Sequence, residues 1–79
     1  MKLTEAQKNI LRITSPNLRA TAGDLAYSLD SLPGPTARAA LSLVRKGLLR
    51  AYTNKEGVTA YSRTAQGSKT IKAASKSRH

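Results

Sequence analysis

Residues 34–50 (GPTARAALSLVRKGLLR) constrain the fold of this chain more than any other segment. Pro35 suits the first turn of a helix, where its missing N–H costs nothing. Gly47 suits the position just past a helix end, because glycine adopts the left-handed conformation freely. The segment therefore predicts a helix of about eleven residues, roughly 16 Å long, which spans about residues 35–46.

The apolar residues of this helix predict which side faces the core. Ala37, Leu41 and Val44 recur at the spacing of one helical face, so we expect them to point inward. If Gly47 ends the helix in a Schellman motif, Leu43 contacts Leu48. That contact accounts for an apolar Leu43 outside the expected core face.

The first part of the chain contains two helix-start signals. A capping box at residues 4–7 (TEAQ) predicts a first helix. Pro16 ends this helix, because a proline excludes the residue before it from helical geometry. Residues 18–20 are extended and predict one very short strand. Thr21 and Asp24 form a second cap, with an acid in the first turn of the helix that follows.

The second helix is short. Leu25, Ala26 and Leu29 share one face, and we expect Tyr27 in the core as well. Residues 30–35 are dense in turn residues and link this helix to the next one.

A hairpin and a last helix complete the chain. Residues 48–53 and 58–63 are strand-like, and the loop 54–57 suits a type I turn closed by a left-handed glycine. A weaker helical pattern starts at Thr64, and residues 75–79 are polar and basic.

This order predicts a mainly α fold with a small β-hairpin. A three-helix core, a two-stranded wing and a C-terminal helix together make a winged helix-turn-helix. We assign residues 1–74 to this single domain and residues 75–79 to a basic flexible tail.

The charge of the chain is strongly uneven. Residues 1–30 carry four Lys and Arg against three acids, whereas residues 31–79 carry ten against one, and the net charge is +10. A solvated surface without a partner would interleave the two signs. The asymmetry indicates a polyanionic partner, of which nucleic acid is the first candidate and an acidic membrane surface the second.

Several function classes find no support in the sequence. There is no cysteine, so neither a disulfide framework nor a cysteine-ligated zinc site is expected. One terminal histidine, four scattered acids and no phosphate-binding glycine loop argue against an enzyme, a metal site or a cofactor. The start of the chain lacks an apolar signal-peptide core, and no segment approaches the ~18 apolar residues of a membrane span. We therefore expect a soluble, cytoplasmic protein, and of the two polyanionic partners we expect nucleic acid rather than a membrane.

From Thr21 to Gly67 the sequence resembles the winged-helix domain of MarR-type bacterial regulators and, more loosely, that of LexA-type repressors. Three segments carry the likeness: residues 24–29 (DLAYSL), residues 35–49 and residues 63–67 (RTAQG). The last segment has arginine where the family prefers leucine. MarR-type proteins are nearly twice as long and dimerise through extra terminal helices. The resemblance therefore implies the DNA-binding module of the family, and it does not imply an effector, a dimer or antibiotic response.

On this interpretation the helix 35–46 enters the major groove of double-stranded DNA. Its expected outer residues are Thr36, Arg38, Ala39, Ser42, Arg45 and Lys46. Arg38 can bond guanine O6 and N7 together, and Ala39 can contact a thymine methyl group. Thr36 and Ser42 can bond base edges or phosphates. The alternative for Arg45 and Lys46 is that they only complement the negative end of the helix.

The hairpin 48–63 acts as a wing on the DNA backbone or in the minor groove. Lys55 lies at its tip, with Arg50 and Arg63 lower on the strands, where cations suit phosphate or minor-groove contacts. The alternative is an ordinary solvated turn, which the neighbouring Glu56 favours.

The sequence thus predicts a small sequence-specific DNA-binding protein that regulates transcription. Two alternatives remain open: a winged-helix protein-interaction module, such as an adaptor or inhibitor, and a basic RNA-associated protein. A protein-binding face would show large apolar residues, and RNA binders usually expose aromatic platforms. We expect a monomer in solution that pairs weakly on DNA.

Overall fold

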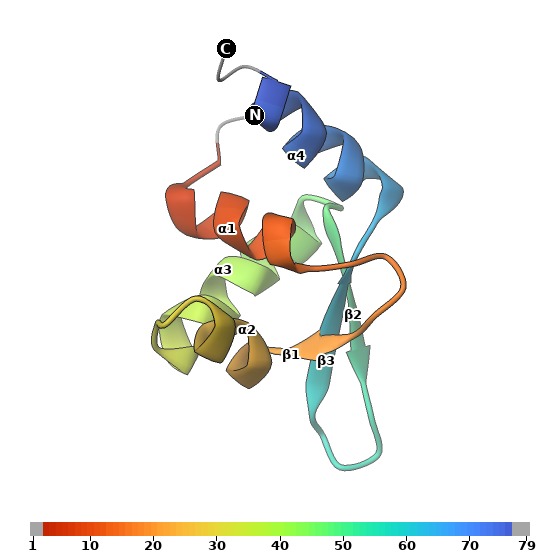
Figure 1. Cartoon of the computed structure of the whole chain (residues 1–79). Helices are drawn as coiled ribbons and strands as arrows, with labels where there is room; N and C mark the ends of the chain where they lie inside the picture. The colour runs from red at the N-terminus through yellow and green to blue at the C-terminus, as the bar shows by residue number, and fades with distance from the viewer. Residues whose placement is uncertain (1–2, 77–79) are drawn as a thin grey trace.

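The structure, a computed structural model, describes residues 3–76 (Figure 1). Its elements in chain order are α1 (Glu5–Ile13), β1 (Ala20–Thr21), α2 (Ala22–Ser28), α3 (Pro33–Arg45), β2 (Leu49–Thr53), β3 (Thr59–Arg63) and α4 (Ala65–Lys76). The strands form one antiparallel sheet in the order β1-β3-β2. The predicted winged helix-turn-helix is confirmed. The short strand forms at Ala20–Thr21 rather than at residues 18–20, and it joins the hairpin as a third strand.

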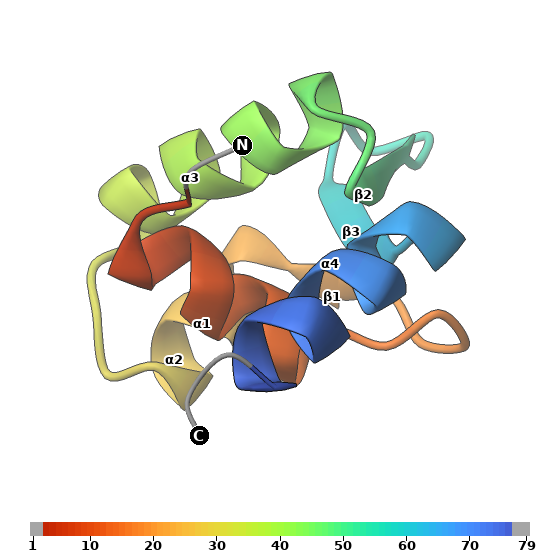
Figure 2. The ribbon, with the colours of Figure 1, turned by 90° about the horizontal axis from the view of Figure 1, so that it is seen from above.

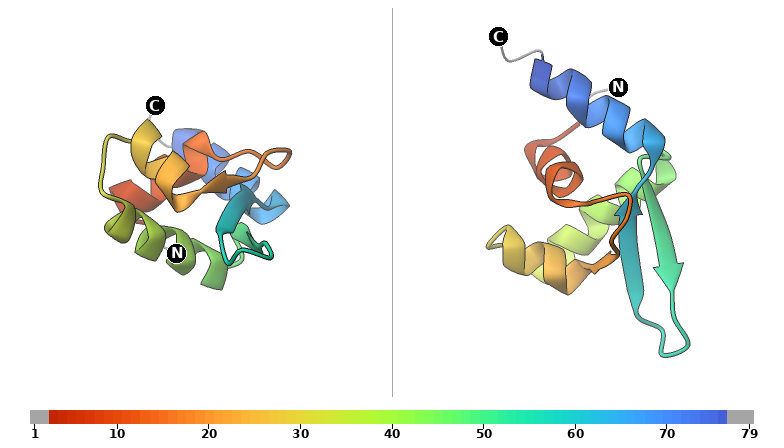
Figure 3. Two further views of the ribbon diagram at one scale, coloured as in Figure 1. Left: turned by 90° about the horizontal axis from the view of Figure 1, so that it is seen from below. Right: turned by 45° about the vertical axis from the view of Figure 1, so that its right-hand side comes forward.

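The helices pack into one body, and the hairpin extends from it. α1 packs against both α3 and α4, and α2 packs against α3 (Figure 2). β2 and β3 continue beyond the helices and project as the wing (Figure 3). The largest fully buried side chains are Ile10, Leu11, Leu25, Leu43 and Leu48. The core therefore lies where α1, α2, α3 and the base of the wing meet.

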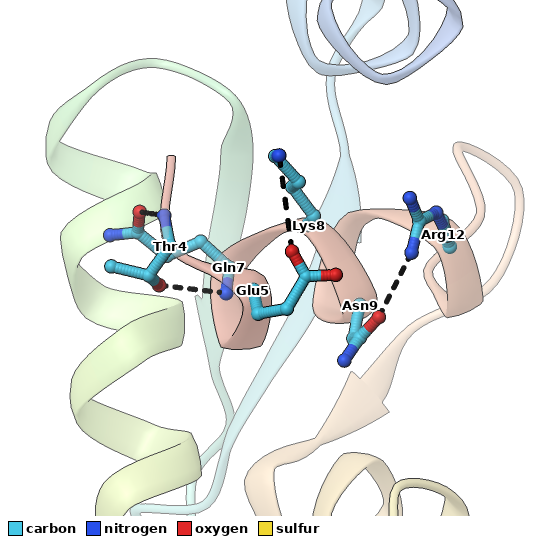
Figure 4. Close-up of polar contacts among 6 residues, drawn as sticks. All are labelled: Thr4, Glu5, Gln7, Lys8, Asn9 and Arg12. Carbon is cyan, nitrogen blue, oxygen red and sulfur yellow. Dashed lines mark hydrogen bonds and ion pairs between the residues drawn. The ribbon is translucent and has the colours of Figure 1, made fainter. Parts of the chain in front are cut away.

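Both predicted helix caps are present, and both are capping boxes. In α1 the Gln7 N–H donates to Thr4 Oγ1 at 3.2 Å, and the Thr4 N–H donates to Gln7 Oε1 at 2.9 Å (Figure 4). The same reciprocal pair joins Thr21 and Asp24 at the start of α2. These local bonds satisfy N–H groups that lack partners within the helix, which is why the sequence located both starts correctly.

The inner face of α2 matches the prediction, apart from its aromatic residue. Leu25 and Ala26 are buried and Leu29 is half-buried. Tyr27 is 91% exposed, so its expected place in the core was wrong. The helix has only seven residues, and the three aliphatic residues already fill its inward face.

The turn between α2 and α3 is held by a residue in a left-handed conformation. Asp30 has φ +52°, and the Ser31 N–H donates to the Ala26 carbonyl at 2.9 Å. α3 then begins at Pro33, two residues before the predicted start. Pro33 and Pro35 remove two of the four N–H groups that a helix start leaves without partners, and no side chain caps this end.

The core face of α3 differs from the prediction by about one residue. Thr36, Ala40 and Leu43 are buried, whereas Leu41 is 45% exposed. Ala37 and Val44, the two other residues expected inward, are only half-buried. The expected face was therefore rotated around the helix axis.

The end of α3 forms the predicted Schellman motif. Gly47 has φ +78°, its N–H donates to the Val44 carbonyl, and the Leu48 N–H donates to the Leu43 carbonyl at 2.9 Å. Both Leu43 and Leu48 are buried. Leu43 is thus a core residue, and its expected place off the core face was wrong.

The wing turn agrees with the sequence. Gly57 has φ +82°, and the Asn54 N–H donates to the Val58 carbonyl at 3.0 Å. The Asn54 side-chain oxygen also accepts from the backbone N–H groups of Glu56 and Val58. The side chain of Asn54 therefore fixes the conformation of the tip.

α4 approaches the base of the wing very closely. The Thr64 hydroxyl donates to the Gly47 carbonyl at 2.7 Å and accepts from the Gly67 N–H at 3.0 Å. A side chain at Gly67 would overlap the Leu48 carbonyl oxygen. Glycine at this position therefore allows the first turn of α4 to pack directly against the backbone of Leu48, just after the end of α3.

The C-terminal boundary differs slightly from the prediction. α4 continues to Lys76, so residues 75 and 76 are helical rather than part of a flexible tail. The rest of the expected tail, residues 77–79, lies outside the described residues. Over the described part of the chain, no helix is long and apolar enough to cross a membrane.

Candidate nucleic-acid interface

The outward side of α3 carries a stripe of three exposed residues, Arg38, Leu41 and Arg45. Their spacing of three and then four residues puts them on one line along the helix. Figure 2 shows α3 along one side of the molecule, with no other described element covering its outer side. We call this line the α3 stripe. It is the surface of α3 that a partner can reach.

Three of the residues expected to contact DNA are partly or wholly withdrawn from this surface. Thr36 is buried, and its hydroxyl donates to the Leu32 carbonyl and pairs with the Ser31 hydroxyl, both at 2.8 Å. Ser42 is half-buried, and its hydroxyl accepts from Gln7 Nε2 at 3.0 Å. Ala39 is half-buried and packs against the core. The outer position expected for Thr36 was therefore wrong, because that hydroxyl fixes the start of α3.

The wing separates the expected cations into two groups. Arg50 on β2 and Lys55 in the turn are exposed. Arg63 at the end of β3 is half-buried, with one terminal nitrogen donating to the Leu11 carbonyl at 2.7 Å and Nε donating to Ser68 Oγ at 3.0 Å. These bonds connect the wing base to α1 and α4. Arg63 therefore holds the wing base in place, whereas from the sequence we expected it to be exposed on the wing.

The structure adds an arginine that sequence reasoning missed. The Arg19 guanidinium carbon lies 3.8 Å from the centre of the Tyr52 ring, a cation–π contact between the segment before β1 and the wing. Hydrogen bonding by Ser62 and then by Arg50 lowers the pKa of the Tyr52 phenol below its ordinary value of 10.0. Nothing in the sequence indicates this contact, because Arg19 and Tyr52 lie far apart in the chain.

A shallow hollow lies beside this stack, between β1 and the wing. Arg19, Thr21, Tyr52 and Val58 are among its lining residues, and its volume is about 230 Å³. Small-molecule sites are usually larger, roughly 300–1,000 Å³. The hollow therefore does not make a convincing ligand site.

The cations of the α3 stripe and of the wing are free of acidic partners within the described part of the chain. Among the side chains that the structure describes, residues 3–72, the ion pair that forms joins Lys8 and Glu5 on α1, at 3.9 Å (Figure 4). The carboxylate of Asp24 is used in the cap of α2. In the same residues, no group of histidine or acidic side chains could hold a metal ion. The exposed positive charge is thus left available to an anionic partner.

No family model matches the chain, and no curated protein matches it. Solved structures match its fold. BldR from Sulfolobus solfataricus, a transcriptional regulator, matches with TM-score 0.83 and 22% identity over 96% of this chain and 55% of that chain. The S. aureus MepR–DNA complex matches with TM-score 0.81 and 20% identity over 94% of this chain and 63% of that chain.

A third match is AdcR, the adhesin competence repressor of Streptococcus pyogenes. Its TM-score is 0.80 with 25% identity, over 98% of this chain and 57% of that chain. The chain thus spans little more than half the length of these proteins. What the matches share with it is the arrangement of helices and wing. The chain therefore has the winged-helix fold of MarR-type regulators.

Proposed function

We propose that this protein binds double-stranded DNA with sequence preference and regulates transcription by occupying its site. The observation that carries the proposal is the α3 stripe, on which two arginines without acidic partners flank an exposed leucine. The major groove, about 12 Å wide, admits a helix of this kind. One of the proteins with the same fold, MepR, has been solved in complex with DNA.

Each exposed cation at α3 and in the wing has a proposed role. Arg38, in the first half of α3, bonds the O6 and N7 atoms of a guanine. Arg45 and Lys46, at the end of α3, contact phosphates. Arg50 and Lys55 contact the backbone or the minor groove beside the wing. Ala39 and Ser42 contribute less to DNA contact than we expected from the sequence, because both are half-buried.

The two alternative functions have less support. A protein-binding face would show a cluster of large apolar side chains, whereas Leu41 is flanked by arginines on its own stripe. An RNA-binding surface would expose several aromatic platforms. Here Tyr61 is buried and Tyr52 is covered by Arg19, which leaves Tyr27 as the exposed ring among the described residues.

The first experiment measures the affinity for random duplex DNA against salt concentration by fluorescence anisotropy. If about six phosphates are neutralised, the logarithm of the affinity should fall against the logarithm of salt with a slope near −5. A protein that fails to bind any duplex at low salt would refute the proposal.

The second experiment separates base reading from backbone contact. Arg38→Ala should cost about 1–3 kcal/mol on a preferred site and relax the sequence preference. Lys55→Ala should weaken preferred and random DNA by similar factors. Lys8→Ala is the matched control, because it removes one charge from the ion pair of α1. If Arg38→Ala and Lys55→Ala behaved the other way round, the proposed docking would be reversed.

We also propose that the 8.5 kDa chain is a monomer in solution. Weak pairing on adjacent half-sites would appear as a Hill slope above one on a two-site duplex. Sedimentation at micromolar concentration tests the first statement, and a dimer that resists dilution would contradict it.

A further inference from the structure

Leu41 occupies the centre of the α3 stripe. It lies one turn after Arg38 and one turn before Arg45, and its side chain is 45% exposed. The core-facing side of α3 consists of Thr36, Ala40 and Leu43, all of which are buried. The core therefore does not need Leu41, and the leucine faces outward between two cations.

Exposure alone does not give Leu41 a role, because single exposed leucines are common on protein surfaces. Its position does. If the stripe enters the major groove, as proposed above, the leucine lies in the middle of the surface that meets the base edges. A leucine side chain can neither donate nor accept a hydrogen bond. The apolar group that base pairs present in the major groove is the C5-methyl group of thymine.

We infer that Leu41 is a specificity-determining residue that recognises a thymine methyl group in the major groove. This inference rests on the proposed function. It moves the methyl contact away from Ala39, which is half-buried and packs against the core.

The geometry also predicts the order of contacts along the site. Arg38 precedes Leu41 by three residues on the same stripe, so the guanine bonded by Arg38 and the thymine read by Leu41 should be neighbouring or nearly neighbouring base pairs. Arg45 follows Leu41 by four residues and lies toward the end of α3. It should therefore contact a phosphate on the far side of the thymine.

The test replaces thymine by uracil, which differs only by the absence of the methyl group. A preferred duplex is first selected from a random pool with the unaltered protein. Each thymine of that duplex is then replaced singly by deoxyuridine, and the dissociation constants are measured by anisotropy. We expect a loss of about fourfold at one or two positions, the value for removing one buried methyl group.

Two variants connect that loss to Leu41. Leu41→Ala should bind the thymine duplex several-fold more weakly and should no longer distinguish thymine from uracil. Leu18→Ala is the matched control, since Leu18 is 71% exposed in the connection before β1 and lies outside the stripe. It should keep the full discrimination. Circular dichroism should show that both variants fold, because both leucines are exposed.

Each contrary result has a distinct meaning. If the unaltered protein binds the duplex but tolerates uracil at every position, the inference is wrong while the proposed function stands. If Leu41→Ala keeps the discrimination, another residue reads the methyl group and the inference is again wrong. If the unaltered protein binds no duplex at all, the proposed function fails and the inference fails with it.

Discussion

Replacing Gly67 by alanine tests how closely α4 approaches the wing. Gly67 is buried in the first turn of α4. A Cβ atom there would overlap the Leu48 carbonyl oxygen and lie 2.9 Å from Cγ of Arg63. The Leu48 carbonyl also accepts a hydrogen bond from the Thr64 N–H at 3.2 Å. The methyl group can therefore be accommodated only if α4 moves and this bond is strained.

The magnitude follows from opposing effects. Overpacking a close contact usually costs about 1–3 kcal/mol, and weakening the hydrogen bond adds about 1 kcal/mol. Alanine favours a helix over glycine by at most about 1 kcal/mol. We expect Gly67→Ala to lower the free energy of unfolding by about 1–3 kcal/mol. For a domain of this size, that corresponds to a decrease in Tm of roughly 5–20 °C.

Urea denaturation followed by circular dichroism measures this change, with Gly23→Ala as the control. Gly23 lies in the first turn of α2, and the nearest atom to an added Cβ would be Thr21 Oγ1 at an ordinary 3.7 Å. This variant should be as stable as the original protein or more stable by up to about 1 kcal/mol. If Gly67→Ala were equally well tolerated, the close packing of α4 on the wing base would be refuted.

Three further predictions concern single side chains. Asp30→Gly should stabilise the fold by about 0.5–1 kcal/mol in the same assay, because Asp30 has a left-handed backbone that glycine adopts without strain. An unchanged urea midpoint of unfolding would contradict this. Arg63→Met should cost about 1–2 kcal/mol of stability, because the hydrogen bond to the Leu11 carbonyl is lost. The DNA affinity of the folded variant should stay within about twofold of that of the original protein. A large loss of affinity in a fully folded variant would show that Arg63 contacts DNA. The lowered pKa of Tyr52 means that the folded state favours the phenolate, so the associated stability is gained as pH rises through the folded pKa. In an ultraviolet titration, Tyr52→Phe should therefore move the onset of phenolate absorbance to higher pH.

Features that depend on neighbouring residues could be predicted from the sequence. The capping boxes, the glycine end of α3 and the Asn54–Gly57 turn each rest on hydrogen bonds within a few residues. Such bonds form wherever the residue types and spacing allow them. They fix where the elements start and end, and their order is enough to identify the winged helix.

The core face of α3 could not be predicted from periodicity, because six of the eight residues from Ala37 to Val44 are apolar. Several faces of the helix then match a core pattern almost equally well. The Schellman motif contained the missing information. Its contact between Leu43 and Leu48 points into the core, and the face that includes Leu43 also includes Ala40 and Thr36.

The candidate site was predicted less well where side chains bond across the fold. Arg63 reaches the Leu11 carbonyl, and Arg19 covers the ring of Tyr52. Both contacts join segments that only the tertiary structure brings together. A count of basic residues along the chain cannot tell such an arginine from an exposed one like Arg38.

The pairing of β1 with β3 has a consequence for the order of folding. Ala20 pairs with Tyr61, about forty residues later in the chain, so this contact closes a loop that contains α2, α3 and β2. Closing a long loop costs more chain entropy than forming a hairpin of neighbouring strands. We therefore expect the helix-turn-helix and the hairpin to form first, with β1 joining the sheet after the rate-limiting step. Substitutions in β1 should then speed unfolding and leave the folding rate unchanged. On this view β1, the last strand to join the sheet, is also the first to separate from it when the protein unfolds.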